Sequence, residues 1–167
     1  MLRFESMYLD SPFAPGRALD IFRPDSDGTA VPALFFVHGG GWHAGSRVDN
    51  HKLIEYFRQR GHHCATADYR LNVTAVDQLA DLRESIRIFA DRLTAEKHRG
   101  RIVIFGSSAG AHLAALLALA APGACGEAVT GAAVPAAGLI VSAFPPSFIP
   151  WPNIFPPIAD AMRRAAG

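Results

Sequence analysis

The sequence predicts an α/β fold with a mostly parallel sheet that is covered by helices on both faces. Apolar runs of strand length alternate with stretches of helical spacing along the 167 residues. The runs at 33–37 and 102–105 are apolar at every position, which is typical of strands covered on both sides. A glycine motif follows each run, and in such sheets binding sites lie at the carboxyl ends of the strands.

The first part of the chain predicts four strands and one helix. The strands are expected at residues 1–10, 17–23, 33–37 and 62–68. The first alternates only weakly and would be an edge strand. Between the last two, Ser46 or Asp49 would cap a helix that ends at Gly61. The apolar side of this helix is formed by Leu53, Ile54 and Phe57.

The second part predicts a long helix, then a strand, a helix and a last strand. Thr74-Ala-Val-Asp77 has the form of a capping box. The helix that follows has apolar residues at helical spacing, namely Leu79, Leu82, Ile86, Phe89 and Leu93. Its charged residues are expected to point mostly outward, namely Asp81, Arg83, Arg87 and Asp91. The remaining elements are a strand at 102–105, a buried helix at 109–121 and a strand at 137–144.

The pattern predicts one domain core at residues 1–144 and an irregular tail at 145–167. Six of the twelve prolines fall between Pro145 and Pro157. Proline removes a backbone donor and breaks both helices and strand ladders, so no regular element is expected across that stretch.

Composition excludes several classes of protein. The formal net charge is +1 and no basic stripe occurs, so neither nucleic acid nor an acidic membrane is an expected partner. The first residues lack the hydrophobic region of a signal peptide, and no run is long enough to span a bilayer. We therefore expect a cytoplasmic protein in which Cys64 and Cys125 stay reduced.

The turn at Gly106-Ser-Ser-Ala-Gly110 has the spacing of a nucleophile elbow, in which a strand turns sharply into a helix. Glycines permit the tight turn, so that Ser108 sits strained at its apex with its hydroxyl facing outward. The alternative is an ordinary serine that caps the following helix.

The segment His38-Gly-Gly-Gly-Trp42 directly follows a buried strand and leaves backbone N–H groups uncovered. Acyl transfer needs such donors, aimed at the oxyanion of a tetrahedral intermediate. The alternative is a glycine turn that binds phosphate. The stretch 39–44 also fits the permissive form of a dinucleotide fingerprint, with Asp68 at the end of a later strand.

Together with Asp68-Tyr-Arg-Leu71, these two motifs resemble the esterase/lipase branch of the α/β-hydrolases, namely its hormone-sensitive-lipase-like and acetyl- or feruloyl-esterase-like members. The resemblance implies that Ser108 is the nucleophile, with no metal and no cofactor. It implies an oxyanion hole formed by the backbone N–H groups of Gly40, Gly41 and Ala109. It also implies supporting roles for His38, Tyr69 and Arg70. The proline and glutamate that follow the Tyr-Arg-Leu motif in the lipase-like group are absent here.

The triad acid and base are not visible in the sequence. In this fold they follow the serine in the order acid, then histidine. No histidine follows His112, which lies one helical turn after Ser108 and is expected to be structural. The carboxylates after Ser108 are Glu127 and Asp160, and neither stands where the triad acid is expected. The resemblance therefore implies the N-terminal part of a hydrolase, truncated after about the sixth strand.

Such a boundary would leave the last strand as an apolar sheet edge, which invites a homodimer or aggregation. The tail is a candidate cover for that edge through Phe144, Phe148, Trp151 and Phe155. Three functions remain open. The first is a serine esterase that acts on small esters through an acyl-enzyme. The second is an inactive truncated hydrolase or binding module, and the third is a nucleotide-binding domain.

Overall fold

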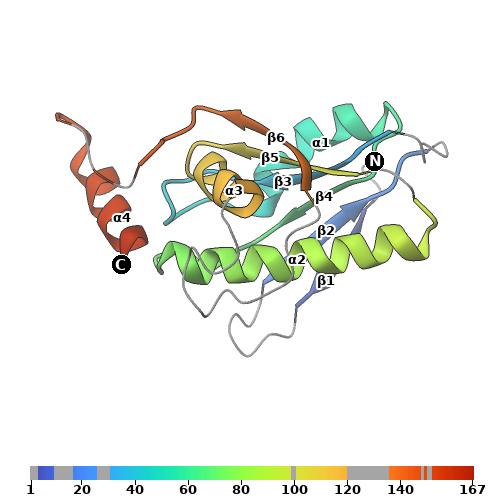
Figure 1. The fold of residues 1–167 in the computed structure, drawn as a ribbon, viewed down its shortest axis with the longest axis horizontal. Coiled ribbons are helices and arrows are strands. Elements are labelled where there is room, and N and C mark those ends of the chain that lie inside the picture. Colours follow the sequence, from blue (N-terminus) through green and yellow to red (C-terminus); the bar gives the residue numbers. More distant parts are fainter. Residues whose placement is uncertain are drawn as a thin grey trace.

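The computed structural model describes residues 4–9, 17–25, 31–98, 101–119, 136–147, 149 and 152–167 (Figure 1). Its strands form one six-stranded sheet with the order β1-β2-β4-β3-β5-β6. The strands are β1 (Glu5–Tyr8), β2 (Ala18–Phe22), β3 (Ala33–Val37), β4 (Cys64–Ala67), β5 (Ile102–Ser107) and β6 (Ala136–Ser142). All six predicted strands are therefore present, with the weakly alternating β1 at one edge of the sheet.

Four strands of the sheet are parallel, as predicted. β3 lies at the centre, where Phe35 is opposite Ala65 of β4 on one side and Ile104 of β5 on the other. β6 extends the parallel part beyond β5. β2 pairs antiparallel with both β1 and β4. Because β3 and β5 are parallel neighbours, the two glycine motifs that follow them meet at the same end of the sheet.

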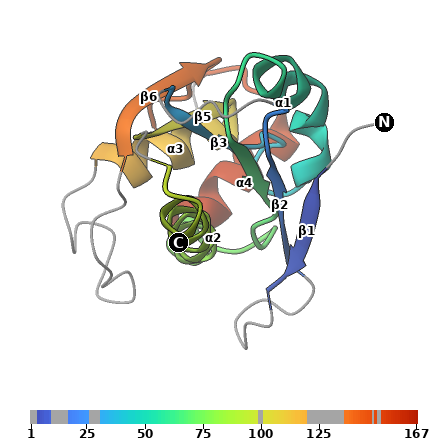
Figure 2. The ribbon, with the colours of Figure 1, turned by 90° about the vertical axis from the view of Figure 1, so that its right-hand side faces the viewer.

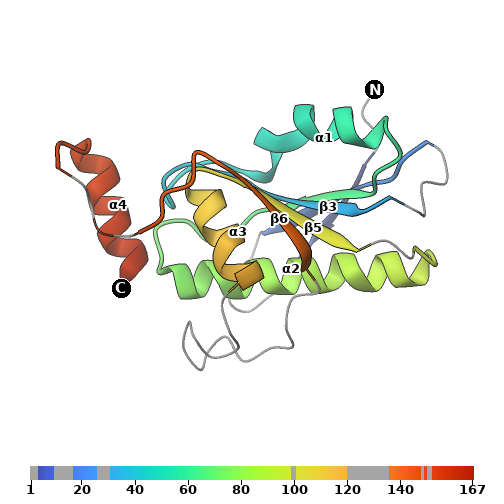
Figure 3. The ribbon, with the colours of Figure 1, turned by 45° about the horizontal axis from the view of Figure 1, so that its top comes forward.

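Helices cover both faces of the sheet (Figures 2 and 3). On one face lies α1 (His51–Arg58), which follows the 3₁₀ turn Arg47–Asn50. On the other lie α2 (Ala75–Ala95) and α3 (Ala109–Leu119). Thr74 caps α2 as predicted, because its hydroxyl oxygen accepts a hydrogen bond of 3.3 Å from the Asp77 amide.

Each face of the sheet has its own apolar core. The larger one packs α2 and α3 against the sheet through Leu79, Leu82, Ile86, Phe89 and Leu113, among other residues. The smaller one packs α1 against the other face, and its buried members are Phe22, Leu34, Phe36, Ile54 and Cys64. The predicted apolar side of α1 is only partly buried, since Leu53 is 38% exposed.

The prediction of an irregular tail at 145–167 is wrong for the last part of this segment, where α4 spans Pro156–Ala166. Pro156 and Pro157 occupy the first helical positions, where no intrahelical hydrogen bond is lost and the fixed φ of proline suits the helix. The helix buries Ala161, Met162 and Ala165 in the same core as Trp42. Prolines therefore start this helix instead of preventing it.

The tail does not cover β6 in the described residues. α4 lies beyond the carboxyl ends of β5 and β6 (Figure 3), while Ile140 and Val141 of β6 remain 46% and 39% exposed. Of the four expected cover residues, Phe148 and Trp151 lie outside the described residues. Phe144 and Phe155 are 41% and 65% exposed. Within the described chain, no helix combines the length and the hydropathy needed to cross a bilayer.

We predict that Phe89→Ala destabilises the fold by about 3–5 kcal/mol, because it opens a cavity where α2 meets β3. Phe89 is fully buried, and its ring centroid lies 6.2 Å from that of Phe35. Urea unfolding followed by circular dichroism measures the loss. Arg87→Ala, on the exposed side of α2, serves as the control and should change the unfolding free energy by less than about 0.5 kcal/mol. Equal effects of the two substitutions would contradict the assigned packing.

Candidate active site

Ser108 lies at a strained turn between β5 and α3. Its φ is +55°, a left-handed value that a non-glycine residue adopts only at a cost, and its side chain is exposed. Its amide donates a hydrogen bond of 2.9 Å to the carbonyl oxygen of Ser142 at the end of β6. These are the features expected of a serine at a nucleophile elbow.

Two glycines make this turn sterically feasible. A Cβ atom at Gly110 would collide with the carbonyl oxygens of Val37 and His38 at the end of β3. A Cβ atom at Gly106 would collide with the backbone of Gly110. The helix can therefore start this close to the strands only if both positions lack a side chain.

The glycine loop (residues 38–45, directly after β3) folds into a compact turn next to Ser108. Gly40 and Gly41 have φ values of +115° and +59°, and the Ala44 amide donates a hydrogen bond of 2.9 Å to the Gly40 carbonyl oxygen. No described residue accepts a hydrogen bond from the amides of Gly40 or Gly41. Ala109 is the first residue of α3, so its amide has no acceptor inside the helix.

One cavity of about 550 Å³ brings these groups together. Ser108, Gly40 and Gly41 line it, and so does His43. The remaining lining is mostly apolar and comes from the glycine loop, the segment after β6 and α4. It consists of Trp42, Ala44, Ala143, Phe144, Pro145, Pro146, Ile158 and Met162.

His38 and Tyr69, for which the resemblance implies supporting roles, contact each other next to the glycine loop. Their rings stack at a centroid distance of 4.2 Å, and the Tyr69 hydroxyl donates a hydrogen bond of 2.9 Å to the His38 carbonyl oxygen. The His38 ring nitrogen Nδ1 lies 2.7 Å from the Gly39 carbonyl oxygen. Burial lowers the pKa of His38 and raises that of Tyr69, so both groups are kept neutral.

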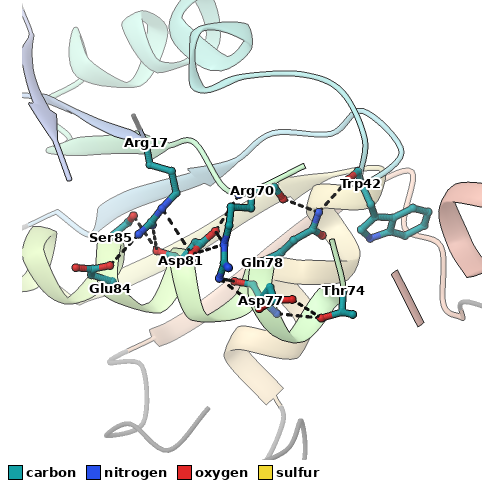
Figure 4. Close-up of polar contacts among 9 residues, drawn as sticks. All are labelled: Arg17, Trp42, Arg70, Thr74, Asp77, Gln78, Asp81, Glu84 and Ser85. Atoms are coloured by element: carbon teal, nitrogen blue, oxygen red, sulfur yellow. Dashed lines mark hydrogen bonds and ion pairs between the residues drawn. The ribbon is translucent and has the colours of Figure 1, made fainter. Parts of the chain in front are cut away.

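Arg70, the third residue with an implied supporting role, faces α2 (Figure 4). Its Nε atom lies 3.0 Å from a carboxylate oxygen of Asp81, which also accepts a hydrogen bond of 2.9 Å from the Arg70 amide. Arg17 approaches the same carboxylate at 3.6 Å. The expected outward orientation of Asp81 is therefore wrong: this residue is 2% exposed because two arginines draw its carboxylate inward.

Histidines near Ser108 differ in their surroundings. His112 is buried, with its ring 5.9 Å from that of Trp42 in an edge-to-face arrangement and 6.5 Å from that of Phe144. Burial lowers its pKa. His112 is thus packed as a structural histidine, whereas His43 lines the cavity.

Of the two side-chain carboxylates that follow Ser108, the one that the structure describes, Asp160, does not line the cavity. Glu127 lies outside the described residues, and Asp160 forms an exposed ion pair with Arg163. Among the described residues no group of three or more histidine, cysteine or carboxylate side chains is arranged to hold a metal ion.

The dinucleotide alternative finds no support in the loop geometry. A 3₁₀ turn at 47–50 follows the glycine loop, and the α-helix α1 begins only at His51, not at the glycines. The Asp68 carboxylate, which would have to bind a ribose, is held by Arg47 through hydrogen bonds of 2.6 Å and 2.9 Å.

Comparison with known families identifies the chain. The family model BD-FAE matches residues 19–147, a span that contains both glycine motifs and the Asp68–Leu71 segment. The chain belongs to the BD-FAE family. This membership confirms the predicted esterase/lipase branch of the α/β-hydrolases.

Curated relatives of this BD-FAE member are esterases. Esterase LipQ of Mycobacterium tuberculosis is 33% identical over 130 residues, which are 71% of this chain and 30% of the relative. Isoprenylcysteine alpha-carbonyl methylesterase ICME of Arabidopsis thaliana is 31% identical over 104 residues, which are 60% of this chain and 24% of the relative. The chain therefore spans less than a third of the length of these relatives.

Solved structures show the same fold. The apo form of Thermogutta terrifontis esterase 2 superposes with a TM-score of 0.71 at 25% identity, covering 99% of this chain and 63% of that one. The form phosphoramylated by tabun gives a TM-score of 0.65 at 27% identity, covering 83% and 55%. The predicted fold class is thereby confirmed.

Sequence reasoning missed one residue that contacts the glycine loop. Gln78 of α2 is fully buried, and its side-chain amide nitrogen lies 2.9 Å from the Trp42 carbonyl oxygen (Figure 4). The sequence signal that could have found it is the position of Gln78, a polar residue next to Leu79 on the side of α2 that faces the sheet.

We predict that the fold loses stability as the pH falls below about 6.5, the ordinary pKa of histidine. His38 and His112 have lowered pKa values in the folded state, so the unfolded chain binds protons there that the folded chain does not. Their stabilising contribution is present above that pH and decreases by up to about 1.4 kcal/mol per pH unit for each group. Urea unfolding at pH 7.5, 6.5 and 5.5 measures the slope. His112→Phe, which keeps an aromatic ring beside Trp42, should reduce it, and an unchanged slope would refute the assignment.

Proposed function

We propose that this chain carries the nucleophile and the oxyanion hole of a serine carboxylic ester hydrolase. The observation that carries the proposal is the position of Ser108. It is an exposed serine with φ at +55°, lining one cavity with two glycines whose amides have no acceptor among the described residues. Membership of the BD-FAE family supports the same conclusion.

In the proposed reaction the Ser108 hydroxyl oxygen attacks the carbonyl carbon of the ester while its proton passes to a general base. The carbonyl oxygen becomes an oxyanion, which would accept hydrogen bonds from the amides of Gly40, Gly41 and Ala109. Collapse of the intermediate expels the alcohol, which takes up the proton, and leaves an acyl-enzyme. Water then attacks the acyl-enzyme in the same way and releases the acid.

The general base and the triad acid are not assigned to residues of this sequence. A serine hydroxyl without a base is a weak nucleophile at neutral pH. Enzymes of this type that lose a triad member retain only the rate that the oxyanion hole and substrate binding provide. Activity is therefore expected to be low wherever no other group supplies the base.

The lining of the cavity favours small uncharged esters. Among the described lining residues, His43 has the one titratable side chain, and most of the others are apolar. A volume of about 550 Å³ lies within the usual range for small-molecule sites. Thermogutta terrifontis esterase 2, which is 26–27% identical, has been solved with butyrate and with propionate bound. This relative supports a short acyl group.

We predict that the chain hydrolyses p-nitrophenyl acetate at a low but saturable rate and that Ser108→Ala abolishes this rate, because the substitution removes the attacking oxygen. The measurement is the release of p-nitrophenolate by the purified wild type and the variant, read against buffer. Labelling with a fluorophosphonate probe, located by mass spectrometry, reports on Ser108 independently of turnover.

The paired outcomes separate the remaining functions. Hydrolysis that depends on Ser108 supports the esterase, and probe labelling of Ser108 without turnover identifies an elbow that lacks a base. Rates at background for both proteins, together with no labelling of Ser108, would refute the proposal. Ser6→Ala is the control, because Ser6 bonds to Asp20 on β2 and does not line the cavity.

A further inference from the structure

Gln78 connects the glycine loop to α2. Its side chain is fully buried, and its amide nitrogen Nε2 donates to two backbone carbonyl oxygens. One belongs to Trp42, at 2.9 Å, and the other to Arg70, at 2.8 Å (Figure 4). A single side chain thus fixes the loop that follows β3 and the loop that follows β4.

The glycine loop needs such external support because its own conformation is strained. Gly40, Gly41 and Trp42 have consecutive positive φ values of +115°, +59° and +63°. Trp42 is not a glycine, so its left-handed conformation persists only where the surroundings enforce it. The Trp42 carbonyl oxygen accepts a second hydrogen bond, of 3.1 Å, from the amide of Asn72.

Gln78 uses the donors of its side-chain amide but not the acceptor. Its carbonyl oxygen Oε1 is buried, and no described residue donates a hydrogen bond to it. A buried acceptor without a partner costs free energy, which an apolar side chain of similar length would avoid. Packing alone therefore does not explain a glutamine here, whereas two bonds to carbonyl oxygens do.

We propose that Gln78 is a positioning residue for the oxyanion hole. By holding the Trp42 carbonyl oxygen, it fixes the peptide planes of the two preceding glycines, which line the cavity and whose amides have no acceptor among the described residues. The inference rests on the proposed function, in which these amides stabilise the oxyanion. It assigns to Gln78 an effect on the transition state, since a hole that is displaced by a fraction of an ångström stabilises the oxyanion less well.

The test compares Gln78→Met with the wild type in ester hydrolysis. Methionine has a similar length and no N–H donor. We expect kcat to fall about 10-fold or more, with KM changed less than about twofold, because the loss concerns the transition state. Hydrogen–deuterium exchange should become faster in the peptide that covers residues 38–45.

The matched control is Ser85→Ala on the same helix. Ser85 is also fully buried, and its hydroxyl donates a hydrogen bond of 3.0 Å to the carbonyl oxygen of Asp81, not to the glycine loop. This variant should keep the wild-type kcat and the wild-type exchange of residues 38–45. A wild-type kcat in Gln78→Met, or an equal loss in Ser85→Ala, would overturn the proposal.

A second variant decides the question if Gln78→Met does not fold. In Gln78→Glu the carboxylate cannot donate, but burial raises the pKa of a carboxyl group, and its protonated form restores one donor. The ratio of its kcat to the wild-type kcat should rise as the pH is lowered from 8 to 6, and a constant ratio would overturn the proposal.

Failure of the proposed function gives a different pattern. In that case the wild type shows neither hydrolysis that depends on Ser108 nor labelling of Ser108 by the fluorophosphonate probe. Hydrogen–deuterium exchange of residues 38–45 in Gln78→Met then tests, without any substrate, whether Gln78 holds the glycine loop. Faster exchange supports this role of Gln78, and unchanged exchange refutes it.

Discussion

The close approach of three backbone segments at the carboxyl ends of β3 and β5 is the constraint on which the site depends. A Cβ atom on Gly39 would lie 2.9 Å from the carbonyl oxygen of Ser107, and Gly106 and Gly110 have no room for one either. With side chains excluded from this junction, α3 begins directly beneath the glycine loop. The short turn that results forces Ser108 into its left-handed conformation and exposes its hydroxyl at the cavity.

This junction explains why the glycine loop is held by side chains. Amides that are to face a cavity cannot take part in a strand ladder or in a helix, so regular secondary structure cannot fix them. The loop is fixed instead through its carbonyl oxygens, by the Tyr69 hydroxyl at His38 and by the Gln78 amide at Trp42. Both groups are buried, where a hydrogen bond competes with little water. The loop can therefore be rigid while its N–H groups stay uncommitted.

Sequence patterns predicted the elements that depend on local chemistry. Apolar runs located the strands, and the two glycine motifs located the turns that meet at Ser108. The orientation of Asp81 was not predictable, because its burial depends on Arg17 and Arg70, which reach it from distant parts of the chain. Likewise, the place of Gln78 on the sheet-facing side of α2 indicates burial but not its partners, which lie on two separate loops. α4 was missed because proline was judged by its effect inside a helix and not at a helix start.

The position of α4 links the prolines to the cavity. Ile158 and Met162 lie one helical turn apart in α4, and both line the cavity together with Pro145, Pro146 and the glycine loop. A helix that began earlier would extend into the segment after β6, whereas Pro156 fixes its first turn. The parts of the cavity lining therefore have different origins. The conformation of the glycine loop and the elbow is dictated by backbone sterics, whereas the lining from α4 and the segment after β6 is set by apolar side chains. Substitutions in α4 can therefore reshape the space for a bound group without altering the position of Ser108.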